Sequence, residues 1–275
     1  MRMNMKHTCD PNMNNTNTEE NTEEERLPVS NRIGRNSFLF WCISKYIPHL
    51  MSVRFCLISI EVQCHRWVKK LTKVLEKTLH RKMLLPERKI RSMEHFLELF
   101  PEARRVFLDG SERSIRRPKN PKVQEEKYSG KKKRHTVKNV VISDENKLIK
   151  VLSKTYEGKK HDFAICKEEK MPKNIPQWIE VFLDLGFEGF AKEFPHLKKI
   201  FMPYKKPKKK ELPKWKKKRN KDISSIRVQV EHAIGGVKRY GIVSDTFRNM
   251  RKEFDDSVML ISCGLWNYHK TFQNS

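Results

Sequence analysis

Residues 104–119 read RRVFLDGSERSIRRPK, and they decide how the rest of the chain is interpreted. The apolar run 106–108 is typical of a buried strand, and it carries one carboxylate, Asp109, to its end. Gly110 and Ser111 then interrupt the run, and several basic residues follow. An acid beside so much positive charge suggests a metal-bound carboxylate that faces phosphates. An Asp-Gly turn after an ordinary strand is the alternative.

The net charge of the chain indicates a polyanionic partner. Its 275 residues include 59 Lys and Arg against 33 Asp and Glu, which gives a formal net charge of +26. This excess is larger than solubility requires, and nucleic acid is the leading candidate partner. A membrane-surface protein would need a basic amphipathic helix with bulky apolar anchors. The six cysteines are scattered without a C-x-x-C pair, so they indicate neither a zinc site nor a disulfide framework.

The distribution of apolar residues predicts a soluble, intracellular protein. The start of the chain lacks the apolar core of a signal peptide. The most apolar stretch, residues 37–60, is interrupted by charged residues and a proline, and no run approaches the roughly 18 to 20 residues that span a bilayer. We expect a cytoplasmic protein that, in a prokaryote, associates with the nucleoid.

Three regions follow from the pattern along the chain. Residues 1–36 are rich in Asn, Thr and Glu and predict a disordered leader. Residues 37–83 predict a small helical region, in which residues 60–82 show apolar side chains at helical spacing. That helix is either the recognition helix of a helix-turn-helix or a helix packed against the main domain. Residues 84–275 form the main domain.

The main domain is predicted to be α/β, with a mixed sheet flanked by helices. The expected strands are 106–109, 135–143, 148–153, 178–183 and 199–202, with a hairpin turn at 144–146. The expected helices are 92–99, about 162–170 and about 222–240, the last with Asp222 or Ser224 as its N-cap.

Three acids in this domain form a candidate site. The segments VFLDG (residues 106–110) and VFLDLG (residues 181–186) are both apolar strands that end in Asp and soon meet Gly. Strands that end on one edge of a sheet would bring Asp109 and Asp184 together. Glu231 is the third acid, beside the apolar stripe of the last predicted helix. Arg227 precedes it by four residues and Lys238 follows it by seven, so all three project from one side of the helix.

Carboxylates gathered in a basic protein have a chemical purpose. Mg²⁺ and Mn²⁺ prefer carboxylate oxygens. Two such ions about 4 Å apart activate a water or a 3′-hydroxyl and stabilise the leaving oxygen of a phosphodiester. Basic residues must then offset the charge of the DNA backbone. The sequence therefore predicts that Asp109, Asp184 and Glu231 bind Mg²⁺ or Mn²⁺ at a two-metal site.

Several basic residues are candidate DNA contacts through phosphate. They are Arg113, Arg116 and Arg117 after the first strand, Lys131, Lys132, Lys133 and Arg134, Lys205 and Lys206 in the run 205–210, and Arg227, Lys238 and Arg239 near the last helix. Trp215 stands among lysines, where it either stacks on a base or anchors the loop. The pair Gly235-Gly236 is unusual inside a helix. It indicates either the close approach of DNA or another element, or the end of the helix.

The chain resembles DDE-superfamily transposases of the insertion-sequence IS5 group, whose catalytic domain is also seen in Harbinger-type elements. The segments that carry the resemblance are FLDGSERSIRRPKNP, KYSGKKKRHTVKN, YEGKKHD, FLDLGFEG, the KKP within MPYKKPKKKEL, and RVQVEHAIGGVKRYGIVSDTFRN. They run in the family's order over about residues 84–249. The spacing Arg227-x3-Glu231-x6-Lys238 reproduces the family's signature around its catalytic Glu, although the tyrosine that often begins this signature is Ser224 here.

The resemblance implies an RNase H-like fold, a catalytic triad of Asp109, Asp184 and Glu231, and metal-dependent hydrolysis at transposon ends followed by strand transfer. It also implies double-stranded DNA as the partner, a homo-oligomer on that DNA, and no membrane or small-molecule cofactor. His161-Asp162 matches another position near the family's site, and we interpret Asp162 as a helix N-cap rather than a metal ligand.

The front of the chain departs from the family. Members carry a helical, helix-turn-helix-like DNA-binding region before the first Asp, and here only residues 60–79 are similar to its last helix. A truncated or domesticated transposase that binds DNA without cleaving it is therefore the alternative function.

Overall fold

The computed structural model describes residues 58–208 and 210–273, which all belong to one compact unit. The predicted leader (1–36) and the start of the predicted helical region (37–57) lie outside the described residues. Within the described part of the chain, no helix is long and apolar enough to cross a membrane.

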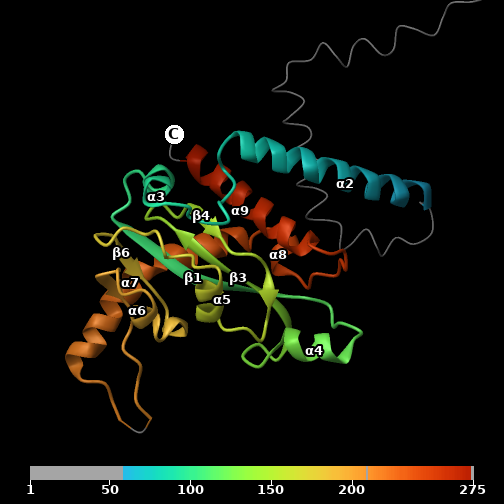
Figure 1. The fold of residues 1–275 in the computed structure, drawn as a ribbon. Coiled ribbons are helices and arrows are strands. Elements are labelled where there is room, and N and C mark those ends of the chain that lie inside the picture. Colours follow the sequence, from blue (N-terminus) through green and yellow to red (C-terminus); the bar gives the residue numbers. More distant parts are fainter. Residues whose placement is uncertain (1–57, 209, 274–275) are drawn as a thin grey trace, which may run out of the picture. The chain divides into compact units, whose positions relative to one another are not determined.

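A mixed sheet forms the centre of the unit (Figure 1). Its strands are β1 (Arg105–Ser114), β2 (Tyr128–Ser129), β3 (Arg134–Ser143), β4 (Ile149–Leu152), β5 (Tyr156–Glu157), β6 (Glu180–Phe182) and β7 (Lys199–Phe201). The order is β2-β3-β1-β6-β7, and β4 and β5 also pair with β3. β1 is antiparallel to β3 and parallel to β6, and β6 is parallel to β7. The predicted strands and the hairpin between β3 and β4 are confirmed.

Helices cover both faces of the sheet. They are α2 (Ile58–Arg81), α3 (Met93–Leu99), α4 (Pro121–Lys127), α5 (Asp162–Glu168), the short 3₁₀ helix η1 (Leu185–Phe187), α6 (Phe190–Glu193), α7 (Lys214–Val237), α8 (Gly241–Ser244) and α9 (Phe254–Gln273). This arrangement confirms the predicted α/β class with an RNase H-like, mixed sheet flanked by helices.

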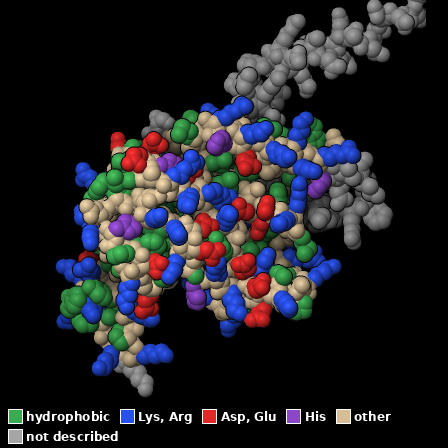
Figure 2. Space-filling view, in the orientation of Figure 1, with side chains coloured by type: hydrophobic (Ala, Val, Ile, Leu, Met, Phe, Trp, Pro, Cys, Tyr) green, Lys and Arg blue, Asp and Glu red, His purple; other side chains and the backbone are tan. Residues whose placement is uncertain are grey.

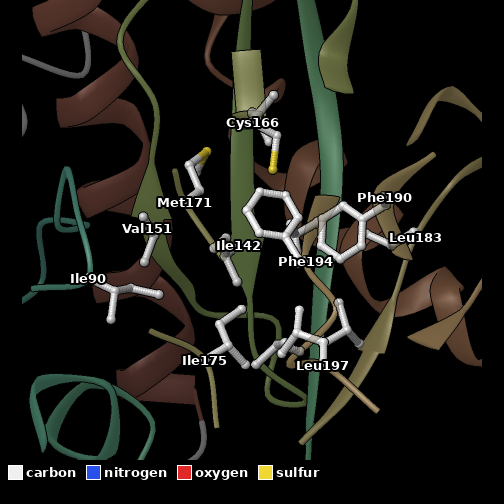
Figure 3. Packing of buried hydrophobic residues seen from close by; sticks show 14 of the residues in the cluster. Ile90, Ile142, Val151, Cys166, Met171, Ile175, Leu183, Phe190, Phe194 and Leu197 are labelled. Atoms are coloured by element: carbon white, nitrogen blue, oxygen red, sulfur yellow. The ribbon is translucent and has the colours of Figure 1, made fainter. Parts of the chain in front are cut away.

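Side chains from the two faces of β1 belong to two different hydrophobic cores, because successive side chains of a strand point to opposite sides. Val106 and Leu108 pack with α3, α5 and α6 in the first core, part of which Figure 3 shows around Phe190, Phe194 and Leu183. Phe107 belongs to the second core, with α7 and α9. A residue two positions after Phe107 therefore faces α7.

β1 continues through Gly110 to Ser114, so the predicted break after Asp109 is wrong. Gly110 pairs with Val140 of β3 inside the ladder. A Cβ at Gly110 would lie 2.6 Å from Cγ of Asp162 on α5. Gly110 therefore makes no turn. Because it has no side chain, the Asp162 carboxylate can lie close to the backbone of β1, and a close approach of this kind is a common reason for Gly within a strand.

α7 begins at Lys214, eight residues before the predicted start at Asp222. Residues 214–221 are mostly Lys and Arg, which are good helix formers. The helix therefore includes these basic residues, although their side chains are not buried. The buried residues of α7 begin only at Ile223. Gly236 lies inside α7, so it does not end the helix. A side chain has no room at this position, because a Cβ would lie 2.2 Å from Cζ3 of Trp266 on α9. Close approach of another protein element therefore explains this glycine.

α2 packs on the same unit through its C-terminal half. Leu79 is buried, and a Cβ at Gly264 of α9 would lie 3.1 Å from its Cδ1. Trp67, in the N-terminal half of α2, is exposed. These contacts support the interpretation of this segment as a helix packed against the main domain.

Candidate active site

Asp109 and Asp184 occupy matching positions on two adjacent parallel strands. Phe107 of β1 pairs with Phe182 of β6, and each aspartate follows two residues later. Asp109 lies within β1, opposite Val141 of β3, and on the side that faces α7. Asp184 directly precedes η1. The strand register therefore delivers both carboxylates to the same place.

One buried arginine joins the two carboxylates. Nη2 of Arg227 on α7 lies 3.3 Å from Oδ2 of Asp109, and its Nη1 lies 3.3 Å from Oδ1 of Asp184. The Arg227 side chain is only 8% exposed. A single cation thus stands between two acids that repel each other, and it holds α7 against the carboxylate edge of the sheet.

The environment of Asp109 disfavours its negative charge. Burial raises the pKa of Asp109 to about 6, against the pull of Arg227 and of the Gly110 N–H, which donates a 2.8 Å hydrogen bond to Oδ1. The charges of Asp184 and Asp162 raise the pKa further. One guanidinium therefore compensates this negative charge incompletely, and the site favours additional positive charge.

Asp162 is a third carboxylate at the site, and our interpretation of it as an N-cap is wrong. α5 begins at Asp162 itself, and the N-cap is His161, which makes no side-chain cap bond. The Asp162 carboxylate lies over Gly110, and its Oδ1 is 3.4 Å from Nζ of Lys138 on β3. That oxygen is buried without a hydrogen bond. The sequence signal for this contact was the glycine directly after Asp109, whereas nothing in the sequence singled out Lys138.

Glu231 projects from the same side of α7 as Arg227, one helical turn later. Lys238 lies two further turns along that side. Burial and the charge of Lys132 lower the pKa of Lys238, while the negative charge of Asp109 raises it. The ion pair of Arg227 with Asp109 shows that this side of α7 faces the aspartate. Glu231 itself is exposed.

The three predicted ligands do not form a preassembled metal site. Among the described residues, no group of three or more His, Cys, Asp or Glu side chains is arranged to hold a metal ion. Arg227 already places a cation between Asp109 and Asp184. The donor set still fits Mg²⁺ or Mn²⁺, because carboxylate oxygens and excess negative charge are what these ions require.

Most of the predicted DNA contacts are exposed. Lys131, Lys132, Lys133 and Arg134 form the turn that enters β3, and Arg116, Arg117, Lys205, Lys206 and Arg239 are also exposed. Figure 2 shows Lys and Arg side chains across the visible face, with acidic side chains among them. The turn before β3 lies at the end of the β1–β3 ladder away from Asp109, because Asp109 pairs with Val141 and Ser114 pairs with Thr136. Its Lys132 contributes to the lowered pKa of Lys238, directly after α7.

Arg113 is buried, and we withdraw it as a DNA contact. The residue is only 3% exposed. Its guanidinium donates to Oδ1 of Asn139 at 3.0 Å and to the carbonyl oxygen of Asp255 at 3.1 Å. The prediction failed because β1 continues past Gly110, and the alternation of the strand turns Arg113 inward under α9.

Comparison with known proteins identifies the family. A model described as "DDE superfamily endonuclease" matches residues 108–267, which include Asp109, Asp162, Asp184, Arg227 and Glu231. The chain is similar to "Probable transposase for insertion sequence element IS702" of Microchaete diplosiphon, with 30% identity over 188 residues. The alignment covers 68% of this chain and 63% of that relative's length. No solved structure gave a significant match. With more than half of its length matched by the family model, the chain belongs to the DDE superfamily of endonucleases.

Proposed function

We propose that the protein is a DNA transposase of the IS5 group with a Harbinger-like catalytic domain. Asp109, Asp184 and Glu231 would hold two Mg²⁺ or Mn²⁺ ions, and the substrate would be double-stranded DNA at transposon ends and at the target. When bound, these ions activate the attacking oxygen and stabilise the leaving one. The observation that carries the proposal is the meeting of Asp109 and Asp184 on one buried cation, within a DDE endonuclease domain.

The basic residues support this proposal by their position. The turn 131–134, Lys238 and Arg239 lie near the C-terminal part of α7, and the face of that helix passes the carboxylates. A DNA strand held there by its phosphates would continue along α7 to Asp109 and Asp184 despite the negative charge of the acids. A homo-oligomer on DNA would follow from the need to act on two transposon ends.

Arg227 has two roles in this proposal. In the protein alone it forms ion pairs with both Asp109 and Asp184 and offsets part of their negative charge. Its planar guanidinium also suits a phosphate oxygen, which a DNA strand would bring to the same place. Transfer of Arg227 from carboxylate to phosphate would free the two acids for metal.

A specific observation favours the second candidate, a transposase remnant that binds DNA without cleaving it. Glu231 is exposed, and the described residues contain no preassembled three-ligand site. If α7 cannot turn or shift Glu231 toward the aspartates, the basic surface would still bind DNA.

The experiment that separates the two uses the full chain and a supercoiled plasmid that carries the DNA flanking the coding sequence in its genome. We expect nicking or joining with Mg²⁺ or Mn²⁺, no reaction in EDTA, and no reaction with Asp109→Ala. Glu125→Gln, at an exposed acid of α4, is the matched control and should cleave normally. Cleavage in EDTA or by Asp109→Ala contradicts the proposal. DNA binding without cleavage by the wild-type protein favours the remnant.

A further inference from the structure

An exposed aromatic cluster marks the first turn of α7, far from the carboxylates. The Trp215 side chain is 58% exposed. Its ring meets that of Tyr204 edge to face, with centroids 5.5 Å apart and planes at 79°. Nζ of Lys216 lies 4.8 Å from the Tyr204 centroid and 5.3 Å from the Trp215 centroid, and Cζ of Arg219 lies 5.9 Å from that of Tyr204. We call Tyr204, Trp215, Lys216 and Arg219 the aromatic cluster.

The aromatic cluster is held together by a backbone clamp. The Tyr204 N–H donates to Oδ1 of Asn220 at 2.7 Å, and Nδ2 of Asn220 donates to the Tyr204 carbonyl oxygen at 3.0 Å. Asn220 lies on α7, so the segment that precedes the helix is fixed to the helix at this point. These two bonds therefore hold the backbone of Tyr204 beside the start of α7, where Trp215 lies.

The chemistry of the aromatic cluster fits nucleic acid. Two π faces and two cations lie together, and the surrounding residues 204–221 contain eleven Lys and Arg but only one acid, Glu211. That acid forms an ion pair with Lys217. A partner must then be a polyanion that also offers flat rings, which describes a DNA strand with an accessible base. An indole that served only to anchor the loop would be covered, whereas more than half of this one is open.

The direction of α7 connects the aromatic cluster to the active site. Lys216 and Arg227 are eleven residues apart, which at 100° per residue places them on nearly the same side of the helix. Their separation along the axis is about 17 Å at 1.5 Å per residue. A DNA strand that follows this side advances about 3.4 Å per nucleotide, so roughly five nucleotides span the distance. Figure 1 shows α7 running from its free end up to the sheet.

We propose that the aromatic cluster stacks on an unpaired base of the DNA strand, about five nucleotides from the phosphate at the carboxylates. The base must be unpaired or at a strand end, because bases inside a duplex have both faces covered by their neighbours. Trp215 supplies the stacking surface, and Lys216 and Arg219 contact the adjoining phosphates. This inference rests on the proposed function for the identity of the partner as DNA.

The test measures binding in EDTA, where no cleavage occurs, with the full chain and fluorescein-labelled probes followed by anisotropy. The probes are a 15-nucleotide oligothymidylate and a 15-base-pair blunt duplex. Trp215→Ala should weaken binding to the single strand roughly tenfold, the size expected for one stacked base, and binding to the duplex less than about twofold. Trp215→Phe should restore most of the single-strand affinity, because it keeps an aromatic face. Trp178→Ala, at an exposed tryptophan near the start of β6, is the matched control and should bind both probes normally.

Two results would overturn the inference: unchanged single-strand affinity in Trp215→Ala, or an equal loss on both probes. Because an exposed residue in the first turn of α7 is replaced, circular dichroism should show an unchanged fold. If helix is lost, Tyr204→Leu replaces the variant, and it too must weaken single-strand binding selectively. Failure of the proposed function is a separate outcome. It appears as wild-type protein that does not cleave with Mg²⁺ or Mn²⁺, whatever Trp215 does in EDTA.

Discussion

Arg227 determines the charge state of the site at the scale of single residues. Its two terminal nitrogens each lie 3.3 Å from one carboxylate, and the side chain is buried. In the absence of metal and DNA, it therefore substitutes for a bound cation. Any ion that enters between Asp109 and Asp184 competes with it.

Replacement of Arg227 should separate metal binding from DNA binding. Arg227→Gln removes the competing cation, so Mn²⁺ should bind the DNA-free protein roughly tenfold more tightly, a change typical of one lost charged hydrogen bond. The same variant should bind DNA more weakly. Titration calorimetry with Mn²⁺ and anisotropy with DNA measure the two effects. Weaker Mn²⁺ binding by the variant would show that Arg227 supports the metal site instead of competing for it.

The pKa of Asp109 predicts a pH-dependent stability. Its folded pKa, about 6, exceeds the usual 3.8, so the stabilisation from the protonated carboxyl is present below about pH 4 and is lost as the pH rises through 6. In EDTA, Asp109→Asn should therefore match the wild type near pH 4 and be more stable by about 3 kcal/mol above pH 6.5. Urea unfolding at a series of pH values checks this. An Asp109→Asn protein that is less stable than the wild type at pH 7 would contradict this. It would mean that the ion pair with Arg227 stabilises the charged carboxylate more than its burial destabilises it.

At the scale of elements, α7 carries Arg227 and Glu231 on one side and the buried apolar residues on another, and Lys238 is its C-cap. The two adjacent glycines of α7, Gly235 and Gly236, also lie on different sides of the helix. Gly235 has open space where a Cβ would stand, whereas a Cβ at Gly236 would lie 2.2 Å from Cζ3 of Trp266. The two positions differ in surroundings within the same helix turn.

Alanine substitutions at the two glycines should have opposite effects. Gly235→Ala should raise the free energy of unfolding by about 1 kcal/mol through helix propensity alone. Gly236→Ala should lower it by about 1–3 kcal/mol, because a methyl group is forced into a packed ring. Denaturant titration of both variants is the measurement. Stabilisation by Gly236→Ala would mean that α7 and α9 are not packed as described.

The predictions from sequence succeeded where local pattern and burial agree, and failed where tertiary contact overrides them. The alternation in 135–143 and the hydrophobic run of β6 identified their strands. Gly110 indicated a turn because the sequence does not show that Asp162 approaches the strand at that point. That error concealed the inward orientation of Arg113. The matching ends of β1 and β6 did anticipate the meeting of Asp109 and Asp184, whereas the contact with Lys138 depended on a register that no pattern reveals.

At the scale of the whole molecule, the proposed binding of DNA depends on the formal charge of +26. The carboxylates alone would repel phosphates, so the exposed basic residues must supply the attraction. The turn 131–134 contributes four of them beside α7. Binding should therefore weaken steeply as salt concentration rises.

Neutralising that turn should reduce the salt dependence of binding. Replacing Lys131, Lys132, Lys133 and Arg134 by Gln removes up to four phosphate contacts. The slope of log K against log salt should then become shallower by as much as about 3.6, at roughly 0.9 per contact. Anisotropy with a duplex at several NaCl concentrations measures the slope. Four exposed lysines replaced elsewhere, at Lys77, Lys82, Lys89 and Lys170, provide the control. An unchanged slope in the turn variant would place the DNA on another face.

The central claim is that Glu231 joins Asp109 and Asp184 in a metal-dependent endonuclease site. The most direct measurement is the initial rate of plasmid nicking with Mn²⁺ by Glu231→Gln, compared with His232→Gln, which changes the neighbouring exposed residue on α7. The account predicts that Glu231→Gln falls to the rate seen in EDTA while His232→Gln cleaves like the wild type. A Glu231→Gln protein that cleaves at the wild-type rate would contradict it.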